Sequence, residues 1–285
     1  MTTLPSSALP PADAWRFRPV SHPRLRAIRA FSDNYIWAIL STDAREVAVV
    51  DPGDDAPVRR FVDEHGLRLT AILLTHHHPD HVGGVAALAS AGDVRVIGPT
   101  DPRVGPIDQA LRDDETIELP AFELHLRAID VPGHTLGHVA FFAEPFGGDP
   151  RPLLFAGDTL FAGGCGRLFE GTPSQMRASL ARLAALPPDT LVYCAHEYTL
   201  SNLRFAAACE PDSADVAARL AEAQRLRAND IETVPSSIGI ERATNPFLRW
   251  DEPSIRAAAS ARLGGADADA DAVFGAIRAW KNGFG

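Results

Sequence analysis

The sequence is poor in lysine, and acidic residues outnumber basic ones. Lys281 is the only lysine among 285 residues, and the formal net charge is −10. Nucleic-acid-binding proteins contact phosphates mainly through Lys and Arg, so this charge balance argues against a nucleic-acid partner. An anionic small-molecule substrate would need a local cationic pocket. The hydrophobic share of 46% and the charged share of 22% are typical of a folded, soluble globular protein.

Cysteine is scarce, and the N-terminal segment has no long apolar run. The sequence has three cysteines, Cys165, Cys194 and Cys209. Their odd number and the lack of CxxC spacing argue against a disulfide framework and for a reducing compartment. Residues 1–23 contain five prolines and no apolar run long enough for a signal peptide or a membrane span. We therefore expect a disordered extension over 1–23, a cytoplasmic protein and no membrane partner.

Strand and helix signals alternate over residues 24–197 and then give way to helical segments alone. Thr172 is a suitable N-cap with Pro173 at the first helical position, which predicts a helix to about residue 185. Other expected helices are 57–65 and 82–91, and expected strands are 24–31, 35–40, 46–50, 69–74, 94–97, 122–131, 138–143, 153–156 and 190–195. Helices are expected at 200–209, 214–229, 254–263 and 271–281, with no strand signal after residue 196. The pattern predicts a domain of interleaved strands and helices at 24–197 and a helical C-terminal domain at 198–285.

One short stretch carries most of the chemical information. The chain reads Thr-His-His-His-Pro-Asp-His over residues 75–81, directly after an expected strand. Neutral imidazoles and a carboxylate are good ligands for Zn and Fe, so this loop is a candidate metal site. His76 and His78 can reach one metal, whereas Asp80 and His81 point toward another. A merely solvated His-rich loop is the alternative interpretation of this stretch alone.

Three further candidate ligands follow other expected strands. They are His134 in Pro-Gly-His-Thr, Asp158 in Ala-Gly-Asp-Thr and His196 in Cys-Ala-His-Glu. Taken together with residues 75–81, this pattern resembles the metallo-β-lactamase superfamily. The resemblance implies an α+β fold, an αββα sandwich with two metals at one edge. It also implies a first metal on His76, His78 and His134, a second on Asp80, His81 and His196, and Asp158 as the bridging ligand.

Longer segments resemble the glyoxalase II (hydroxyacylglutathione hydrolase) family. They are Ser-Asp-Asn-Tyr at 32–35, Phe-Ala-Gly-Asp-Thr-Leu-Phe at 155–161, Gly-Cys-Gly-Arg-Leu-Phe-Glu-Gly at 164–171, the run 196–202, and Asn-Pro-Phe-Leu-Arg at 245–249. The resemblance covers about residues 24–285, and it implies that the first domain, 24–197, is catalytic and that the second, 198–285, binds substrate. It implies a thioesterase that hydrolyses S-D-lactoylglutathione to D-lactate and glutathione, the second step of methylglyoxal detoxification.

The same resemblance implies a set of substrate-binding residues. The positions that match the family's glutathione contacts are Arg167, Phe169, Tyr198, Arg278 and Lys281. Arg can bind a glutathione carboxylate through two parallel hydrogen bonds. Two positions depart from the animal pattern, because Arg167 stands where a Lys can occur and Phe169 stands where a Tyr hydroxyl can contact the tripeptide.

The implied mechanism uses hydroxide bridging two divalent metals as the nucleophile, with Asp158 bridging and Asp80 orienting the hydroxide. Zinc is the expected metal, and Fe and Mn accept the same ligands. The alternative function is a mononuclear-iron persulfide dioxygenase that uses glutathione persulfide. An RNA phosphodiesterase fits the acidic charge less well. A non-catalytic metal-binding module would not account for a complete set of ligands of the open-site type. We expect a monomer.

Overall fold

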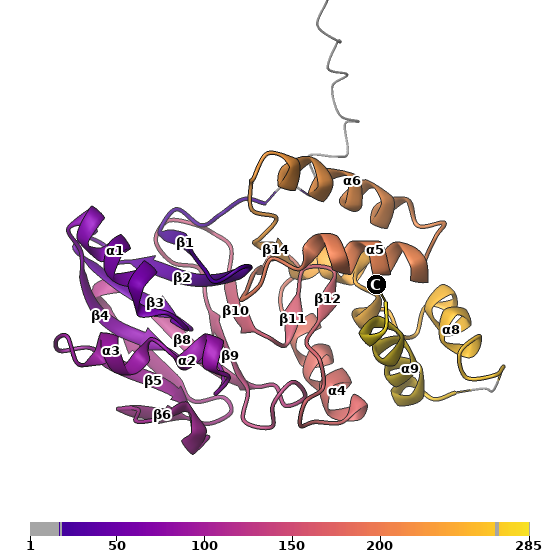
Figure 1. The fold of residues 1–285 in the computed structure, drawn as a ribbon, viewed down its shortest axis with the longest axis horizontal. Coiled ribbons are helices and arrows are strands. Elements are labelled where there is room, and N and C mark those ends of the chain that lie inside the picture. The colour runs from indigo at the N-terminus through magenta and orange to yellow at the C-terminus, as the bar shows by residue number, and fades with distance from the viewer. Residues whose placement is uncertain (1–16, 18, 266–267, 285) are drawn as a thin grey trace, which may run out of the picture.

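Two β-sheets form the centre of the molecule (Figure 1). The computed structural model describes residues 17, 19–265 and 268–284. The first sheet contains, in spatial order, β1 (Leu25–Ala30), β2 (Asn34–Leu40), β3 (Glu46–Val50), β4 (Arg68–Leu73), β5 (Arg95–Pro99) and β6 (Gln109–Leu111). The second contains β14 (Ser236–Ser237), β13 (Leu191–Cys194), β10 (Leu153–Gly157), β9 (Val139–Ala143), β8 (Leu124–Asp130) and β7 (Thr116–Leu119).

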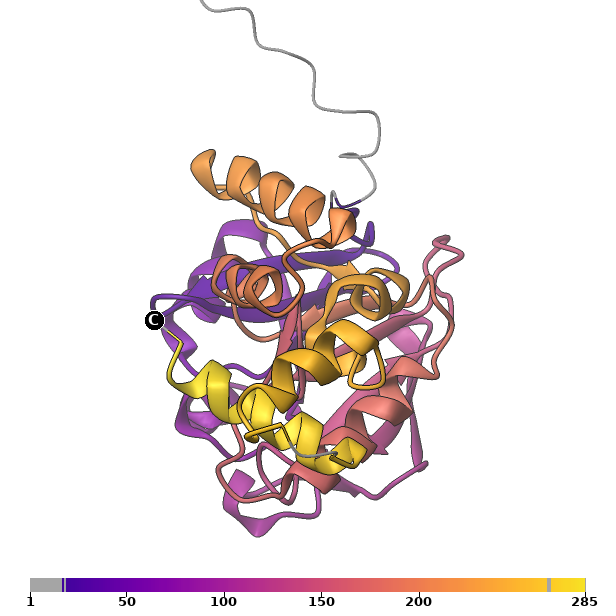
Figure 2. The same ribbon diagram turned by 90° about the vertical axis from the view of Figure 1, so that its right-hand side faces the viewer.

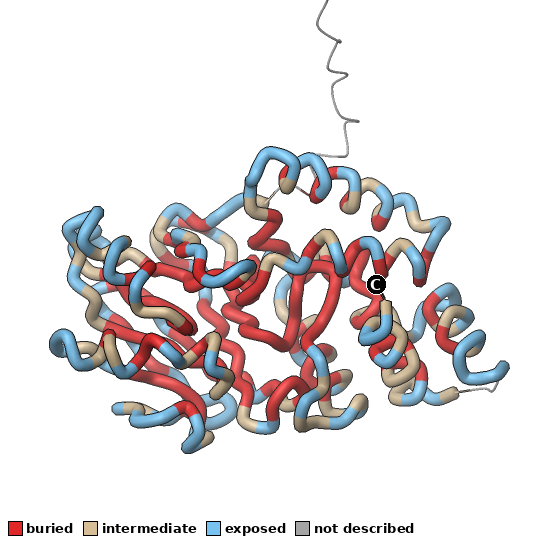
Figure 3. The backbone as a smooth tube through the Cα atoms, in the orientation of Figure 1, coloured by how far each residue is buried: buried red, intermediate tan, exposed pale blue. Residues whose placement is uncertain are grey.

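Three apolar clusters define the layers of the fold. Side chains from both sheets, among them Trp37 and Phe141, pack together in the middle cluster. Helices α1 (Asp55–His65) and α3 (Val85–Ala89) cover the outer face of the first sheet, with Val58 in its cluster. Helix α4 (Pro173–Ala184) covers the second sheet through Met176 and Leu180. The strands are the most buried part of the chain (Figure 3). This arrangement confirms the predicted αββα sandwich.

The N-terminal strands and helix α4 match the sequence predictions closely. Strands β1, β2 and β3 form an antiparallel meander. Thr172 caps α4, and its hydroxyl accepts a hydrogen bond from the Gln175 amide while the Gln175 side chain accepts one from the Thr172 amide. Most of the predicted extension 1–23 lies outside the described residues. Within the part that is described, the side chain of His22 is buried and stacks on Phe146.

The predicted helix 82–91 is wrong, because the chain forms two short helices there. Helix α2 (Pro79–Val82) ends before Gly83 and Gly84, and α3 follows. A Cβ at Gly83 would lie 2.5 Å from the Gly53 carbonyl oxygen, and one at Gly84 would lie 2.6 Å from the Asp55 nitrogen. The two glycines therefore let the histidine loop pass against the backbone of the β3–α1 turn, and the helix is interrupted for that contact.

The C-terminal region consists mainly of helices, which stand together on one side of the sandwich (Figure 2). They are α5 (Thr199–Cys209), α6 (Ala214–Ala228), α7 (Ile238–Thr244), α8 (Pro253–Ser260) and α9 (Ala270–Asn282). The sequence pattern predicted neither α7 nor strand β14, which pairs antiparallel with β13. A two-residue strand has no detectable periodicity, so its pairing is decided by the neighbouring strand. None of the described helices is long and apolar enough to cross a membrane.

A buried ion pair connects the C-terminal helices to the rest of the fold. Arg219 of α6 pairs with Glu241 of α7, and both side chains are almost inaccessible to solvent. Glu241 also accepts hydrogen bonds from the Gly163 amide and the Asn245 side chain. Gly163 lies in the turn of the hairpin formed by β11 (Leu160–Phe161) and β12 (Gly164–Cys165). The pair therefore fixes this hairpin against the helices.

We expect Glu241→Ala to lower the free energy of unfolding by about 3–5 kcal/mol, because it leaves the Arg219 guanidinium buried and unpaired. Urea denaturation followed by circular dichroism would measure this loss. Glu118→Ala removes an exposed carboxylate from β7 and serves as the matched control. A loss in Glu241→Ala no larger than in this control would contradict the importance of the buried pair.

Candidate metal centre

Four chain segments that follow strands meet at one edge of the sandwich. His76 and His78 lie in the loop after β4, and His81 lies in α2. His134 comes after β8, Asp158 directly after β10, and His196 shortly after β13. The loop after β4 is anchored by Asp51, whose carboxylate accepts hydrogen bonds from the amide and hydroxyl of Thr75 at 2.8 Å each. The fold thus brings all seven predicted ligands together.

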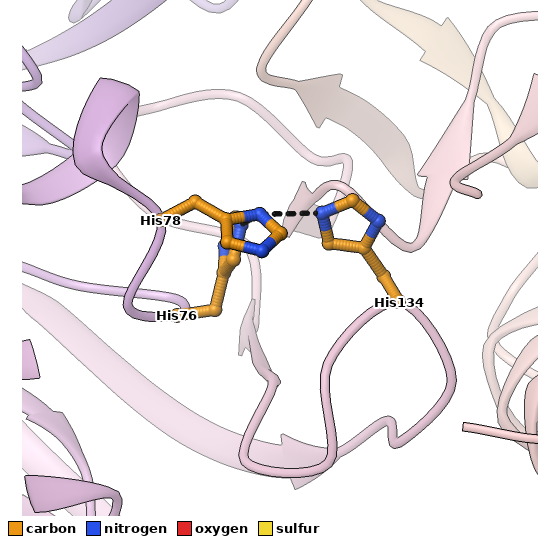
Figure 4. Close-up of side chains that lie close together, drawn as sticks. All are labelled: His76, His78 and His134. Carbon is orange, nitrogen blue, oxygen red and sulfur yellow. Dashed lines mark hydrogen bonds between the residues drawn. The ribbon is translucent and has the colours of Figure 1, made fainter. Parts of the chain in front are cut away.

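His76, His78 and His134 form a first set of donors (Figure 4). The Nδ1 atom of His78 lies 3.1 Å from Nε2 of His76 and 2.9 Å from Nε2 of His134. Asp80, His81 and His196 form a second set. In this set Oδ2 of Asp80 lies 3.5 Å from Nε2 of both His81 and His196.

Asp158 lies between the two sets and offers one oxygen to each. Its Oδ2 atom is 3.3 Å from Nε2 of His134, in the first set. Its Oδ1 atom is 3.3 Å from Nε2 of His196 and 3.5 Å from Nε2 of His81, in the second set. A carboxylate in this position is suited to bridge two cations.

Metal ions would satisfy the donor atoms better than hydrogen bonds among the side chains do. Nε2 of His81 and Oδ1 of Asp158 are buried and have no hydrogen-bond partner among the described residues. Buried polar atoms of this kind are rare in folded proteins and call for a ligand or ion. Imidazole and carboxylate donors in two clusters suit two first-row divalent metals. The described residues therefore fit a dinuclear centre.

Burial and the neighbouring carboxylates shift the pKa values of two candidate ligands in opposite directions. Burial lowers the pKa of His76 well below its usual value, so this imidazole is neutral and can act as a ligand. Burial disfavours the charged form of His81, but Asp158 and Asp51 outweigh it and raise the His81 pKa well above the usual value. In the metal-free protein His81 therefore holds a proton, which a metal would displace.

Several side chains orient the candidate ligands by hydrogen bonds. Oδ1 of Asp33 lies 2.8 Å from Nδ1 of His196, and the side-chain Nδ2 of Asn34 donates to Oδ2 of Asp80 at 3.0 Å. Nε2 of His138 accepts a hydrogen bond from the Asp158 amide at 3.0 Å. The sequence pattern predicted no role for Asp33. The signal available for Asp33 was its place in the family segment 32–35.

A cavity of about 590 Å³ opens beside the metal centre. Its walls contain candidate metal ligands together with all the predicted substrate-binding residues, Arg167, Phe169, Tyr198, Arg278 and Lys281. The ring of Tyr198 stacks on His196 with centroids 4.7 Å apart, and the ring of Phe169 makes T-shaped contacts with His78 and His134. Arg278 is buried, and its Nη1 donates to the carbonyl oxygen of Cys165 at 2.8 Å. The cavity is therefore cationic and aromatic at its walls.

Comparisons with known proteins agree with this geometry. The family model for the metallo-beta-lactamase superfamily matches residues 32–196, so the chain is a member of that superfamily. A second family model, hydroxyacylglutathione hydrolase C-terminus, matches residues 197–284. A hydroxyacylglutathione hydrolase from Cupriavidus taiwanensis is 55% identical over 268 residues, which is 92% of this chain and 99% of the relative. The chain belongs to the hydroxyacylglutathione hydrolase family.

Solved structures show similar folds at lower identity. The BLEG-1 B3 metallo-beta-lactamase aligns with a TM-score of 0.59 at 22% identity, over 79% of this chain and 99% of that one. The protein TTHA1623, crystallised in a di-iron-bound form, aligns with a TM-score of 0.53 at 26% identity, over the same shares of the two chains. The first similarity concerns the fold alone.

We expect Asp33→Ala to weaken binding at the second donor set about 10–100-fold, because His196 loses the acceptor that orients its ring. Chelator competition on the purified protein, with the two metals removed stepwise, would measure both affinities. Asp93→Ala, an exposed change in the loop between α3 and β5, is the control. An unchanged second affinity in a folded Asp33→Ala protein would show that this carboxylate does not support the ligand.

Proposed function

We propose that the chain is a dinuclear-metal thioesterase that hydrolyses S-2-hydroxyacylglutathiones, with S-D-lactoylglutathione as substrate and D-lactate and glutathione as products. The observation that carries this proposal is a cavity whose walls hold members of both donor sets together with a group of cationic side chains. Membership of the hydroxyacylglutathione hydrolase family supports the same activity.

The proposed ligand assignment follows the two clusters. His76, His78 and His134 would hold one metal, and Asp80, His81 and His196 would hold the other, with Asp158 shared. When bound, two divalent metals supply a nucleophile at neutral pH by lowering the pKa of water, and they polarise the thioester carbonyl. Zinc suits this donor set, and iron is the metal of the di-iron relative.

The protein's own side chains would bind and orient the substrate. Arg167 and Lys281 stand in the cavity wall, where their charges would pair with glutathione carboxylates in an otherwise acidic protein. Arg278 would add positive charge while its Nη1 holds the hairpin at Cys165. Asp80, fixed by Asn34, would orient the attacking nucleophile. A thiol leaving group with a pKa near 8.5 departs as thiolate, so a general acid is not required.

The alternative, a mononuclear-iron persulfide dioxygenase, would use the first donor set alone. It leaves no role for the second set, in which Asp80, His81 and His196 converge and His196 is itself oriented by Asp33. The match to the hydroxyacylglutathione hydrolase C-terminus also favours the thioesterase.

The direct test is hydrolysis of S-D-lactoylglutathione by the purified protein, followed at the thioester absorbance, with metal content determined on the same sample. We expect rapid turnover with about two metals per chain, as the two-metal mechanism requires. Absence of turnover together with a single iron would overturn the thioesterase and support the dioxygenase.

Asp158→Ala should lose metal and activity together, because it removes a carboxylate whose two oxygens face the two donor sets. We expect kcat/KM to fall more than about 100-fold, beyond the effect of removing a supporting residue. Metal analysis and the thioester assay on one sample would measure both losses. Asp212→Ala, an exposed change before α6, is the control. An active, metal-replete Asp158→Ala protein would rule out the bridging role.

Substrate binding should weaken as pH rises through about 8. Burial and the neighbouring guanidiniums of Arg278 and Arg167 lower the pKa of Lys281 to about 8, so its positive charge is present below that pH and lost above it. Losing one charge-assisted hydrogen bond should raise KM about 10-fold between pH 7 and 9. Lys281→Arg keeps its charge and should remove this part of the pH dependence. Identical KM profiles for the two proteins would exclude Lys281 as the titrating group.

A further inference from the structure

The only lysine of the chain lines the cavity that holds the candidate metal ligands. Lys281 is on α9, and its Nζ lies 2.9 Å from Oγ and 3.1 Å from the carbonyl oxygen of Ser201 on α5. We propose that Lys281 is also an acylation site, whose amine takes up the 2-hydroxyacyl group of a glutathione thioester in this cavity. This inference rests on the proposed substrate class.

The surroundings of Lys281 remove part of the water that would stabilise its charge. Nζ lies 5.5 Å from the ring centroid of Phe205 and 5.9 Å from that of Phe284, so apolar groups replace part of its water shell. Among the described residues, no carboxylate forms an ion pair with it. A lysine amine becomes nucleophilic when it is desolvated or placed next to other cations.

Four titratable side chains act on the amine from the elements packed around it. Arg278, one turn earlier on α9, and Arg167 lower its pKa, whereas Cys165 and Cys209 act weakly in the opposite sense. Burial is the largest influence, and the resulting pKa is about 8. At pH 7 roughly a tenth of the molecules therefore carry the free amine. For an ordinary lysine, with a pKa near 10.4, a far smaller fraction of the molecules would carry the free amine.

The reaction balances without any further reagent. The Nζ lone pair attacks the thioester carbonyl, the carbon–sulfur bond breaks, glutathione leaves as thiolate, and the amine loses one proton to solvent. The two Ser201 oxygens accept hydrogen bonds from the amine and so restrict its orientation. The product is a neutral amide, which removes the positive charge from this part of the cavity. Acylation should therefore weaken the binding of the next substrate molecule.

The test incubates the metal-loaded enzyme with excess S-D-lactoylglutathione and maps the modification by peptide mass spectrometry after acid quenching. The protein's α-amino group is an internal reference, because its ordinary pKa of about 7.7–8.0 matches that of Lys281. We expect Lys281 to gain one lactoyl group at least about 10-fold faster than this amine, since Lys281 lines the cavity that would bind the thioester and so meets it at a raised local concentration. S-Methylglutathione, which has no acyl group, should suppress labelling of Lys281 and leave the α-amino group unaffected.

Two controls separate this inference from the proposed function. Lys281→Arg keeps the charge but should show no adduct at position 281, and the thioester absorbance of each sample reports hydrolysis. Hydrolysis with Lys281 unlabelled, or labelled no faster than the α-amino group, would overturn the acylation site and leave the thioesterase intact. Selective labelling without hydrolysis would support the acylation site and overturn the thioesterase.

Discussion

The structure depends on the placement of one buried carboxylate between two groups of imidazoles. Asp158 can present one oxygen to each donor set only because β10 ends directly before it and the chain then turns sharply at Gly157, which has φ of 49°. A Cβ at Gly157 would lie 2.5 Å from Oγ1 of Thr75 and 2.7 Å from the His138 ring. The close packing of these side chains therefore holds the carboxylate where two cations would need it.

Hydrogen bonds from surrounding side chains hold the candidate ligands and their backbone in place. Asp51 anchors the histidine loop through Thr75, Asp33 orients His196, and His138 holds the Asp158 backbone. Each of these partners comes from a different part of the chain, so the centre forms only when both sheets are packed together. The buried donors without partners are tolerated because metal binding would satisfy them.

The C-terminal helices add the other half of the site. Tyr198, Arg278 and Lys281 come from this region or its first residues, and they face the metal ligands across one cavity. The buried Arg219–Glu241 pair and the hydrogen bond from Gly163 to Glu241 hold the hairpin in a fixed position against the helices. An acidic protein thus presents a cationic wall at the position where an anionic thioester would bind. Lys281 lies in this wall, where we propose it both as a partner for a substrate carboxylate and as a nucleophile.

The sequence by itself determined the family, the αββα fold and the seven candidate ligands, because residues 75–81 and the polar residues after three strands are local patterns. The capping box at Thr172 was equally local. Only the tertiary structure decided that Gly83 and Gly84 interrupt a helix, that β14 joins the second sheet and that Asp33 supports His196. These features arise from contacts between residues far apart in the chain, which neither periodicity nor spacing along the sequence encodes.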